Sequence, residues 1–265
     1  MSPLAQLLPQ LVLVLGILAV IQIATFARML LAIRATPVPR PQFTPYNEPD
    51  DWMPAERRAE VADQVAALAV EGFTVVMNVF WESARRRLIV MGNDATAEFA
   101  AVVSNTFSGQ RVAISLSISC ELADGREVSV DDSALGTGLP GLPQLTRWQL
   151  PMAHPPARLL RAFRYILARD FPGQRPTVRD QNLSIEERTR RSMIRETTHW
   201  IARGYYAIDP RTNTPFPTWG SALRMMIHAA FPFGSINRRR VRRHAQALLA
   251  EAESVPWEHH RVQHT

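Results

Sequence analysis

The arginine cluster at residues 238–243 is the sharpest functional feature of the sequence. It comprises Arg238, Arg239, Arg240, Arg242 and Arg243. A planar guanidinium group binds phosphate oxygens in bidentate fashion, whereas cations near the start of a helix are disfavoured by the helix macrodipole. The cluster therefore predicts a site for an anionic partner, and we expect lipid head-group phosphates there. Nucleic acid, a solvated surface and an internal contact with acidic residues are the alternatives.

A glycine pattern could indicate nucleotide binding. Gly136, Gly138 and Gly141 match G-x-G-x-x-G. The dinucleotide-binding motif requires a helix that begins within this pattern. Pro140 and Pro143 prevent such a helix, so we expect no nucleotide cofactor here.

Two further sets of residues could support catalysis. Cys120 could act as a nucleophile with His154 as its base, but Cys120 falls on the apolar face of a predicted strand, which favours a buried structural thiol. Asp124, Asp131 and Asp132 surround a predicted hairpin. Because adjacent side chains on a strand point to opposite faces, we do not expect Asp131 and Asp132 to converge. We therefore assign no catalytic residue.

Metal and covalent-cofactor chemistry is restricted by composition. All 30 basic residues other than histidine are arginine, which excludes a lysine Schiff base, and the single cysteine excludes an intrachain disulfide. Five of the seven histidines form a group at 259–264 or a scattered pair in predicted helices, namely His259, His260, His264, His199 and His228. None has metal-ligand spacing on one helix face. We expect the domain to fold without a metal or cofactor.

Charge is distributed unevenly along the chain. Residues 1–150 contain 11 arginines and 15 acidic residues, whereas residues 151–265 contain 19 arginines and 9 acidic residues. This asymmetry suggests an anionic partner for the second half. Attraction between the two halves is the alternative explanation.

An apolar segment precedes the domain. Residues 1–27 carry no charged side chain, and a run of about 20 apolar residues suffices to cross a bilayer. We expect a single-pass anchor through residues 7–33 rather than a cleaved signal peptide, because no arginine precedes the run. Arg28, Arg34 and Arg40 follow it, so the positive-inside rule predicts an external amino terminus and a cytoplasmic domain at the cell membrane.

The first part of the domain has the pattern of an antiparallel sheet. We expect strands at 73–81, 88–91, 111–122 and 127–130. A polar connection at 82–87 and Asp124-Gly125 indicate two hairpins. In 111–122, large apolar residues alternate with small or polar ones, which predicts one buried and one polar face.

Helices are expected before, within and after the sheet, at 55–71, 94–103, 155–170, 184–203, 219–231 and 235–253. Their caps would be Asp51, Asp94 or Thr96, Ser184 and Ser235. Residues 135–156 form a long connection between the sheet and the later helices. We expect it to wrap the sheet edge and bury its leucines, with a covered functional site as the alternative.

These elements predict an α+β protein with one transmembrane helix, a small, mostly antiparallel sheet and a helical, basic carboxyl-terminal half. The predicted divisions are an anchor at 1–34, a proline-rich linker at 35–54, a soluble domain at 55–253 and a flexible tail at 254–265. The domain comprises an α/β part at 55–150 and a helical part at 151–253. We expect a non-enzymatic interaction module at the cytoplasmic membrane face. The alternative is a membrane-tethered enzyme with a site under residues 135–156. The sequence identifies no protein partner.

Overall fold

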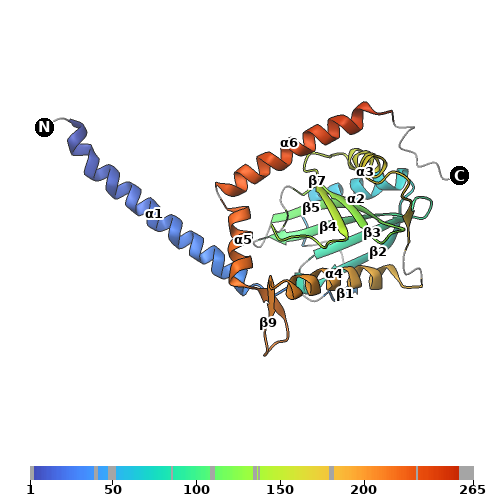
Figure 1. The fold of residues 1–265 in the computed structure, drawn as a ribbon, viewed down its shortest axis with the longest axis horizontal. Coiled ribbons are helices and arrows are strands. Elements are labelled where there is room, and N and C mark those ends of the chain that lie inside the picture. Colours follow the sequence, from blue (N-terminus) through green and yellow to red (C-terminus); the bar gives the residue numbers. More distant parts are fainter. Residues whose placement is uncertain are drawn as a thin grey trace.

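The chain folds into a mainly antiparallel sheet flanked by helices (Figure 1). The computed structural model describes residues 3–38, 41–46, 52–84, 86–107, 111–133, 136, 138–178, 182–230 and 232–256. The helices are α1 (Pro3–Ala35), α2 (Ala55–Val70), α3 (Pro156–Asp170), α4 (Ile185–Ala202), α5 (Trp219–Ala229) and α6 (Phe233–Ser254). The predicted α+β class is confirmed.

The main sheet has eight strands, and seven of them form a continuous series from β1 to β7. The strands are β1 (Phe43–Pro45), β2 (Thr74–Trp81), β3 (Arg86–Asn93), β4 (Glu98–Phe107), β5 (Arg111–Leu122), β6 (Glu127–Asp131), β7 (Leu145–Gln149) and β8 (Pro176–Thr177). All pairs are antiparallel except β6 with β7, and β8 pairs with β5. Two short strands, β9 (Tyr206–Ile208) and β10 (Pro215–Pro217), form a separate ribbon.

Strand β5 confirms the alternation seen in the sequence. Its residues Leu116, Ile118, Cys120 and Leu122 are at most 2% exposed, whereas Ser117 and Ser119 on the other face are partly exposed. Both predicted hairpins also form, since β2 pairs with β3 and β5 pairs with β6. A central strand with one apolar and one polar face separates two different environments, and both matter for the candidate site.

The helix expected at 94–103 is wrong, because this segment forms strand β4. Ala100 and Val102 face the core, while Phe99, Ala101 and Val103 pack on the opposite face of the sheet. A strand covered on both faces is apolar at every position, and periodicity cannot distinguish it from a short buried helix. A turn at residues 94–97 precedes it, with the amide of Ala95 donating to Asn93 Oδ1.

The connection at 135–156 contains regular structure that we did not expect. Residues 145–149 form β7, which extends the sheet edge in parallel with β6. The expectation that leucines of this segment are buried is confirmed for Leu142 and Leu150, at 7% and 0% exposed.

The helices cover both faces of the sheet (Figure 1). On one face, apolar residues of α2 and α3 pack against the sheet, and α6 packs outside α3. On the other face, Ile185 and Met193 of α4 pack beside a smaller cluster from β2 and β3. Helix α6 and the sheet are therefore connected mainly through α3.

Helix α1 extends away from the rest of the molecule (Figure 1). Its stretch Val12–Ala35 has a mean hydropathy of 2.1 and is long and apolar enough to cross a membrane. Large apolar residues along it are exposed, for example Leu13 at 64% and Ile23 at 69%. Its last turn contacts the domain, because α1 packs against α5 and β10.

Within the proline-rich linker, the described residues 38 and 43–45 contact the domain. Strand β1 pairs with the edge of β2, and the amide of Val38 donates to Pro215 O at 2.7 Å. Proline is tolerated at a sheet edge, where one side of the strand needs no amide donor.

The predicted helix caps have different outcomes. Ser184 caps α4, with its Oγ accepting from the amide of Glu187. Ser235 does not cap α6, because that helix begins earlier, at Phe233, with Pro232 as N-cap. Pro54 is the N-cap of α2, and Asp51 lies outside the described residues. So do residues 257–265 of the expected tail.

A buried ion pair joins the two parts of the domain. Arg164 of α3 donates from Nε and Nη2 to the two carboxylate oxygens of Glu98 on β4, at 3.0 and 2.7 Å. The side chains are 9% and 1% exposed. The sequence pattern of this helix suggests the opposite, because Arg164 falls at helical spacing from Arg158, Arg161 and Arg169, which favours a shared polar face; the structure corrects this for Arg164. The pair supports attraction between the acidic and basic halves.

Removing one member of this pair should destabilise the fold strongly. We expect Arg164→Met in the full chain to lower the free energy of unfolding by about 3–5 kcal/mol, because it leaves the Glu98 charge buried without its partner. The double variant Glu98→Met/Arg164→Met should recover most of that loss. Denaturant unfolding in detergent measures both variants.

The exposed ion pair between Arg158, which also belongs to α3, and Glu253 of α6 provides the control. Arg158→Met should cost less than about 1 kcal/mol. Equal losses for Arg158→Met and Arg164→Met would contradict the special role of the buried pair.

Candidate functional site

The arginine cluster lies in the early turns of α6. Arg238 is partly exposed and donates to Ser235 Oγ at 3.2 Å. The other four, Arg239, Arg240, Arg242 and Arg243, are exposed. Within the part of the chain that the structure describes, none of the five forms an ion pair with a carboxylate. The internal contact with acidic residues is therefore not seen for this cluster, and its charge is available to a partner.

A groove of about 770 Å³ lies beside the cluster. We call it the basic groove, and α4, α5, α6, β7 and the segment at 136–141 contribute to its lining. Its ionisable residues are Arg147, Glu196, Arg224, His228, Arg240 and His244. Three arginines outnumber one carboxylate, so the groove favours an anionic occupant. Arg240 belongs to both the groove and the cluster.

The 136–141 segment is fixed to α4 and α5 by side chains donating to its carbonyl groups. Arg224 Nε donates to Gly138 O at 2.8 Å, and Trp200 Nε1 donates to Pro140 O at 2.9 Å. Gly138 has φ +74°, and a Cβ there would lie 2.8 Å from the Cβ of His228. The backbone at position 138 therefore lies too close to α5 for any residue with a side chain, which explains the glycine there. No helix begins within residues 136 and 138–141, as expected from the prolines.

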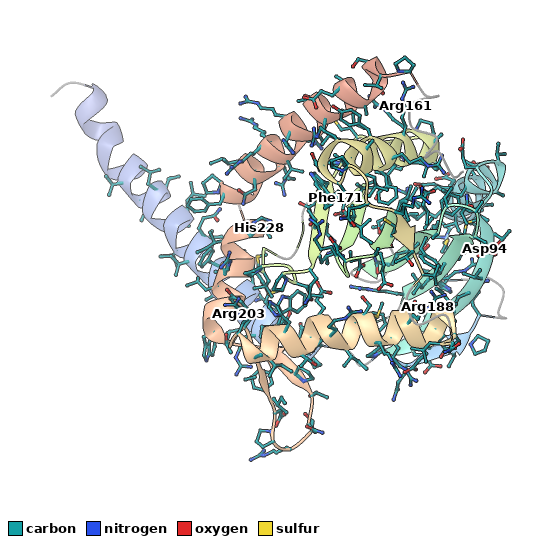
Figure 2. All side chains as sticks on the ribbon, turned by 45° about the vertical axis from the view of Figure 1, so that its right-hand side comes forward. Asp94, Arg161, Phe171, Arg188, Arg203 and His228 are labelled. Carbon is teal, nitrogen blue, oxygen red and sulfur yellow. The ribbon has the colours of Figure 1, made fainter. Side chains whose placement is uncertain are left out.

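A second cavity, of about 350 Å³, lies between α4 and the polar face of the sheet. Its lining includes Ser117, Ser119, Glu127 and three arginines of α4, namely Arg188, Arg191 and Arg195. Figure 2 shows Arg188 on α4, on the side of the sheet opposite α3. The sequence predicted the polar face of β5, but it did not predict that arginines of α4 cover this face. This cavity shares Arg147 and Glu196 with the basic groove.

Burial perturbs two carboxylates that line the second cavity. It raises the pKa of Glu127, and the neighbouring Glu121 raises it further, while Arg195 and Arg147 oppose the shift. Burial likewise raises the pKa of Glu196, against the effects of Arg147 and His199. Perturbed carboxylates beside a cavity are typical of functional sites, although structural ion networks show them too.

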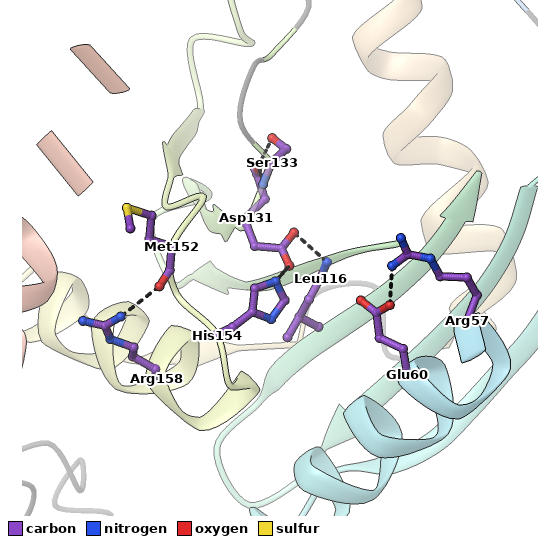
Figure 3. A network of polar contacts seen from close by, with 9 residues as sticks. Arg57, Glu60, Leu116, Asp131, Ser133, Met152, His154 and Arg158 are labelled. Carbon is purple, nitrogen blue, oxygen red and sulfur yellow. Dashed lines mark hydrogen bonds and ion pairs between the residues drawn. The ribbon is translucent and has the colours of Figure 1, made fainter. Parts of the chain in front are cut away.

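The three predicted aspartates have separate partners, and Figure 3 shows Asp131 and Ser133 together with Leu116 and His154. Asp124 pairs with Arg126 in the hairpin turn. Asp131 accepts from Ser133 and lies 3.8 Å from Arg147 Nε. Asp132 accepts from the amide of Leu116 at 2.9 Å, and its other oxygen lies 3.3 Å from His154 Nε2.

The remaining sequence candidates are not assembled into a catalytic centre. Cys120 is 2% exposed, and burial raises the pKa of its thiol, while His154 pairs with Asp132. His199 and His228 are partly exposed, and only His228 lines the basic groove. Figure 2 shows His228 on α5, between α1 and the sheet. The described residues contain no metal-binding group, and His259, His260 and His264 lie outside them.

Sequence reasoning missed the basic groove because its residues are far apart in the chain. Arg147 belongs to β7, Glu196 to α4, Arg224 to α5 and Arg240 to α6. No spacing rule connects these positions. The available signal was the long connection at 135–156, for which a covered functional site was the alternative explanation, but its length did not identify the residues on α4, α5 and α6 that face it.

Stability should depend on pH through Asp132. Burial raises its pKa from 3.8 to about 6, so the ionised carboxylate destabilises the folded state above pH 6, and this cost disappears below about pH 4. We expect Asp132→Asn to be more stabilising, relative to wild type, at pH 7.5 than at pH 4 by about 2–3 kcal/mol. Denaturant unfolding at both pH values measures the difference.

Asp63→Asn, on the exposed surface of α2, is the control and should change stability equally at the two pH values. A pH-independent effect of Asp132→Asn would show that the Asp132 carboxylate has an ordinary pKa.

Comparison with known proteins gives no assignment. No family model matches the chain, and no curated protein or solved structure matches it either. The arrangement of charge, cavities and exposed surface is therefore the basis on which a function can be argued.

Proposed function

We propose that this protein is a single-pass, membrane-anchored, non-enzymatic interaction module, and that its arginine cluster binds anionic lipid head groups at the cytoplasmic face of the cell membrane. The observation that carries the proposal is the exposed cluster on α6, whose arginines form no ion pair within the described residues. Guanidinium groups gain most when phosphate oxygens are close.

The position of the cluster relative to α1 supports lipid as the source of phosphate. Helix α1 is apolar enough to span a bilayer, and its last turn packs against α5, the helix directly before α6. An anchored domain meets head groups at a high local concentration, so weak contacts become populated. A negatively charged leaflet attracts each nearby basic residue by about 1 kcal/mol.

The orientation of the domain follows from the flanking arginines. Arg28 and Arg34 lie at the domain end of α1, and basic residues are enriched on the cytoplasmic side of membrane helices. The cytoplasmic leaflet is also the one that carries anionic lipid. Anchor orientation and arginine cluster thus favour the same side of the membrane.

Removal of cluster charge should weaken association with anionic membranes. The test uses nanodiscs and a fluorophore attached at Gln246→Cys in a Cys120→Ala background. Energy transfer from this fluorophore to acceptor lipids should become more efficient when phosphatidylserine replaces part of the phosphatidylcholine. We expect Arg242→Gln/Arg243→Gln to reduce this increase at least twofold, because about 2 kcal/mol of attraction is lost.

Arg57→Gln/Arg58→Gln on α2 removes the same charge from another exposed surface and is the matched control. Duplex DNA at equal phosphate is the competitor. An unchanged transfer efficiency in the Arg242/Arg243 variant would refute the lipid contact, and displacement of the fluorophore from the membrane by DNA would favour nucleic acid.

A membrane-tethered enzyme is the second candidate, and the basic groove favours it. The groove is lined by the 136–149 segment and contains Glu196, a carboxylate with a raised pKa, together with His228 and His244. These are residue types that can exchange protons with a substrate. Its arginines would require that substrate to be anionic.

Pyrophosphate is a suitable probe of this groove. If the groove binds polyanions, pyrophosphate should stabilise the full chain in detergent against unfolding, by about 2.7 kcal/mol at 100 times its Kd. Arg147→Gln/Arg240→Gln should remove this stabilisation, whereas Arg57→Gln/Arg58→Gln should not. The absence of stabilisation in the wild-type protein would argue against the enzyme.

A further inference from the structure

Large apolar side chains remain exposed where α5 meets α6. We call them the α5–α6 corner: Trp219, Leu223, Ile227, Phe233 and Ile236, which are 55%, 41%, 38%, 53% and 59% exposed. The first three are spaced by four residues and so share one face of α5. On the adjacent face of the helix, Ala222 and Met226 are buried. Contiguous exposed apolar surface of this kind marks a contact with another protein or a membrane.

The corner lies next to the anchor. Helix α5 packs against α1, and the guanidinium of Arg34, in the last turn of α1, stacks 4.0 Å from the Phe216 ring centroid and 5.5 Å from that of Trp219. In Figure 1, the end of α5 and the start of α6 lie on the side of the domain from which α1 extends. A bilayer that surrounds α1 would therefore also reach the corner.

Charge along this part of the chain is complementary to a membrane surface. From Trp219 to Ala250 the sequence contains no acidic residue. Along α6, the apolar Phe233 and Ile236 come first and the arginines at 238–243 follow. Amphipathic elements that lie in a membrane interface combine apolar side chains below the head groups with arginines among them, and tryptophan is enriched at the same depth.

We infer that the α5–α6 corner is a second membrane contact, in which these apolar side chains insert among the lipids beside α1 while the arginine cluster engages the head groups. The inference rests on the proposed membrane anchor. The occupant of the apolar surface is a lipid bilayer, and the domain is held against the membrane by two separate elements.

Spin labels test this contact in the full chain, reconstituted in nanodiscs containing phosphatidylserine. Cys120→Ala provides the background, and labels are placed singly at Leu223→Cys and Ile236→Cys. Val70→Cys on α2, where Val70 is 87% exposed, serves as the aqueous control, and Leu18→Cys in α1 as the anchor control. The measurement compares collision rates with molecular oxygen, which dissolves in lipid, and with a water-soluble nickel complex.

Labels at 223 and 236 should show an oxygen-to-nickel ratio several-fold above that at position 70 and close to that at position 18. If they match position 70 while position 18 remains in lipid, the corner inference is wrong and the anchor stands. If position 18 also behaves as aqueous, the anchor itself fails. Exclusion of both reagents at 223 and 236 would indicate a protein cover, such as a second copy of the chain, and would also overturn the inference.

Discussion

The ion pair between Glu98 and Arg164 is the interaction on which the rest of the structure depends. It joins the start of β4 to the middle of α3 inside the apolar core. A buried charge without its partner is costly, so the two hydrogen bonds fix where α3 lies over the sheet. Thr96, in the preceding turn, donates to the same carboxylate at 2.8 Å. A polar pair thus specifies the register of two elements that apolar packing alone could align in several ways.

Helix α3 in turn positions α6 and everything that α6 carries. Arg161 donates to the carbonyl oxygens of Ala252, Glu253 and Val255, and Figure 2 shows it beside the carboxyl-terminal end of α6. Cations bonded to the last carbonyls of a helix also complement its dipole. The arginine-rich end of α6 is far from these bonds, so one helix combines a fixed end with an end whose charge is available to a partner.

The sequence indicated the fold class and several elements, because local patterns carry that information. Alternation in 111–122 identified β5, Ser184 and Glu187 identified the start of α4, and the uncharged run before Arg28 identified α1 as apolar enough to span a membrane. Strand β4 was missed because burial on both faces removes alternation. Strand β7 was missed because its parallel pairing with β6 depends on a distant contact. The same limit applies to the site: the cluster at 238–243 is visible as a run, but the basic groove is assembled from four separated elements.

In mechanical terms, α6 is a beam clamped to α3 at its carboxyl-terminal end and bonded to α5 near its start, where Asn237 donates to His228 O. Arg161, with the surface pairs Arg158–Glu253 and Arg169–Glu251, forms the clamp, and the opposite end carries Phe233 and Ile236. A displacement applied to that end is delivered to α3, because a helix is stiff along its axis and bends only gradually. Arg164 lies one turn beyond Arg161 on α3. A force on the first turn of α6, at the surface of the domain, is therefore transmitted through α3 to the buried pair of Arg164 and Glu98.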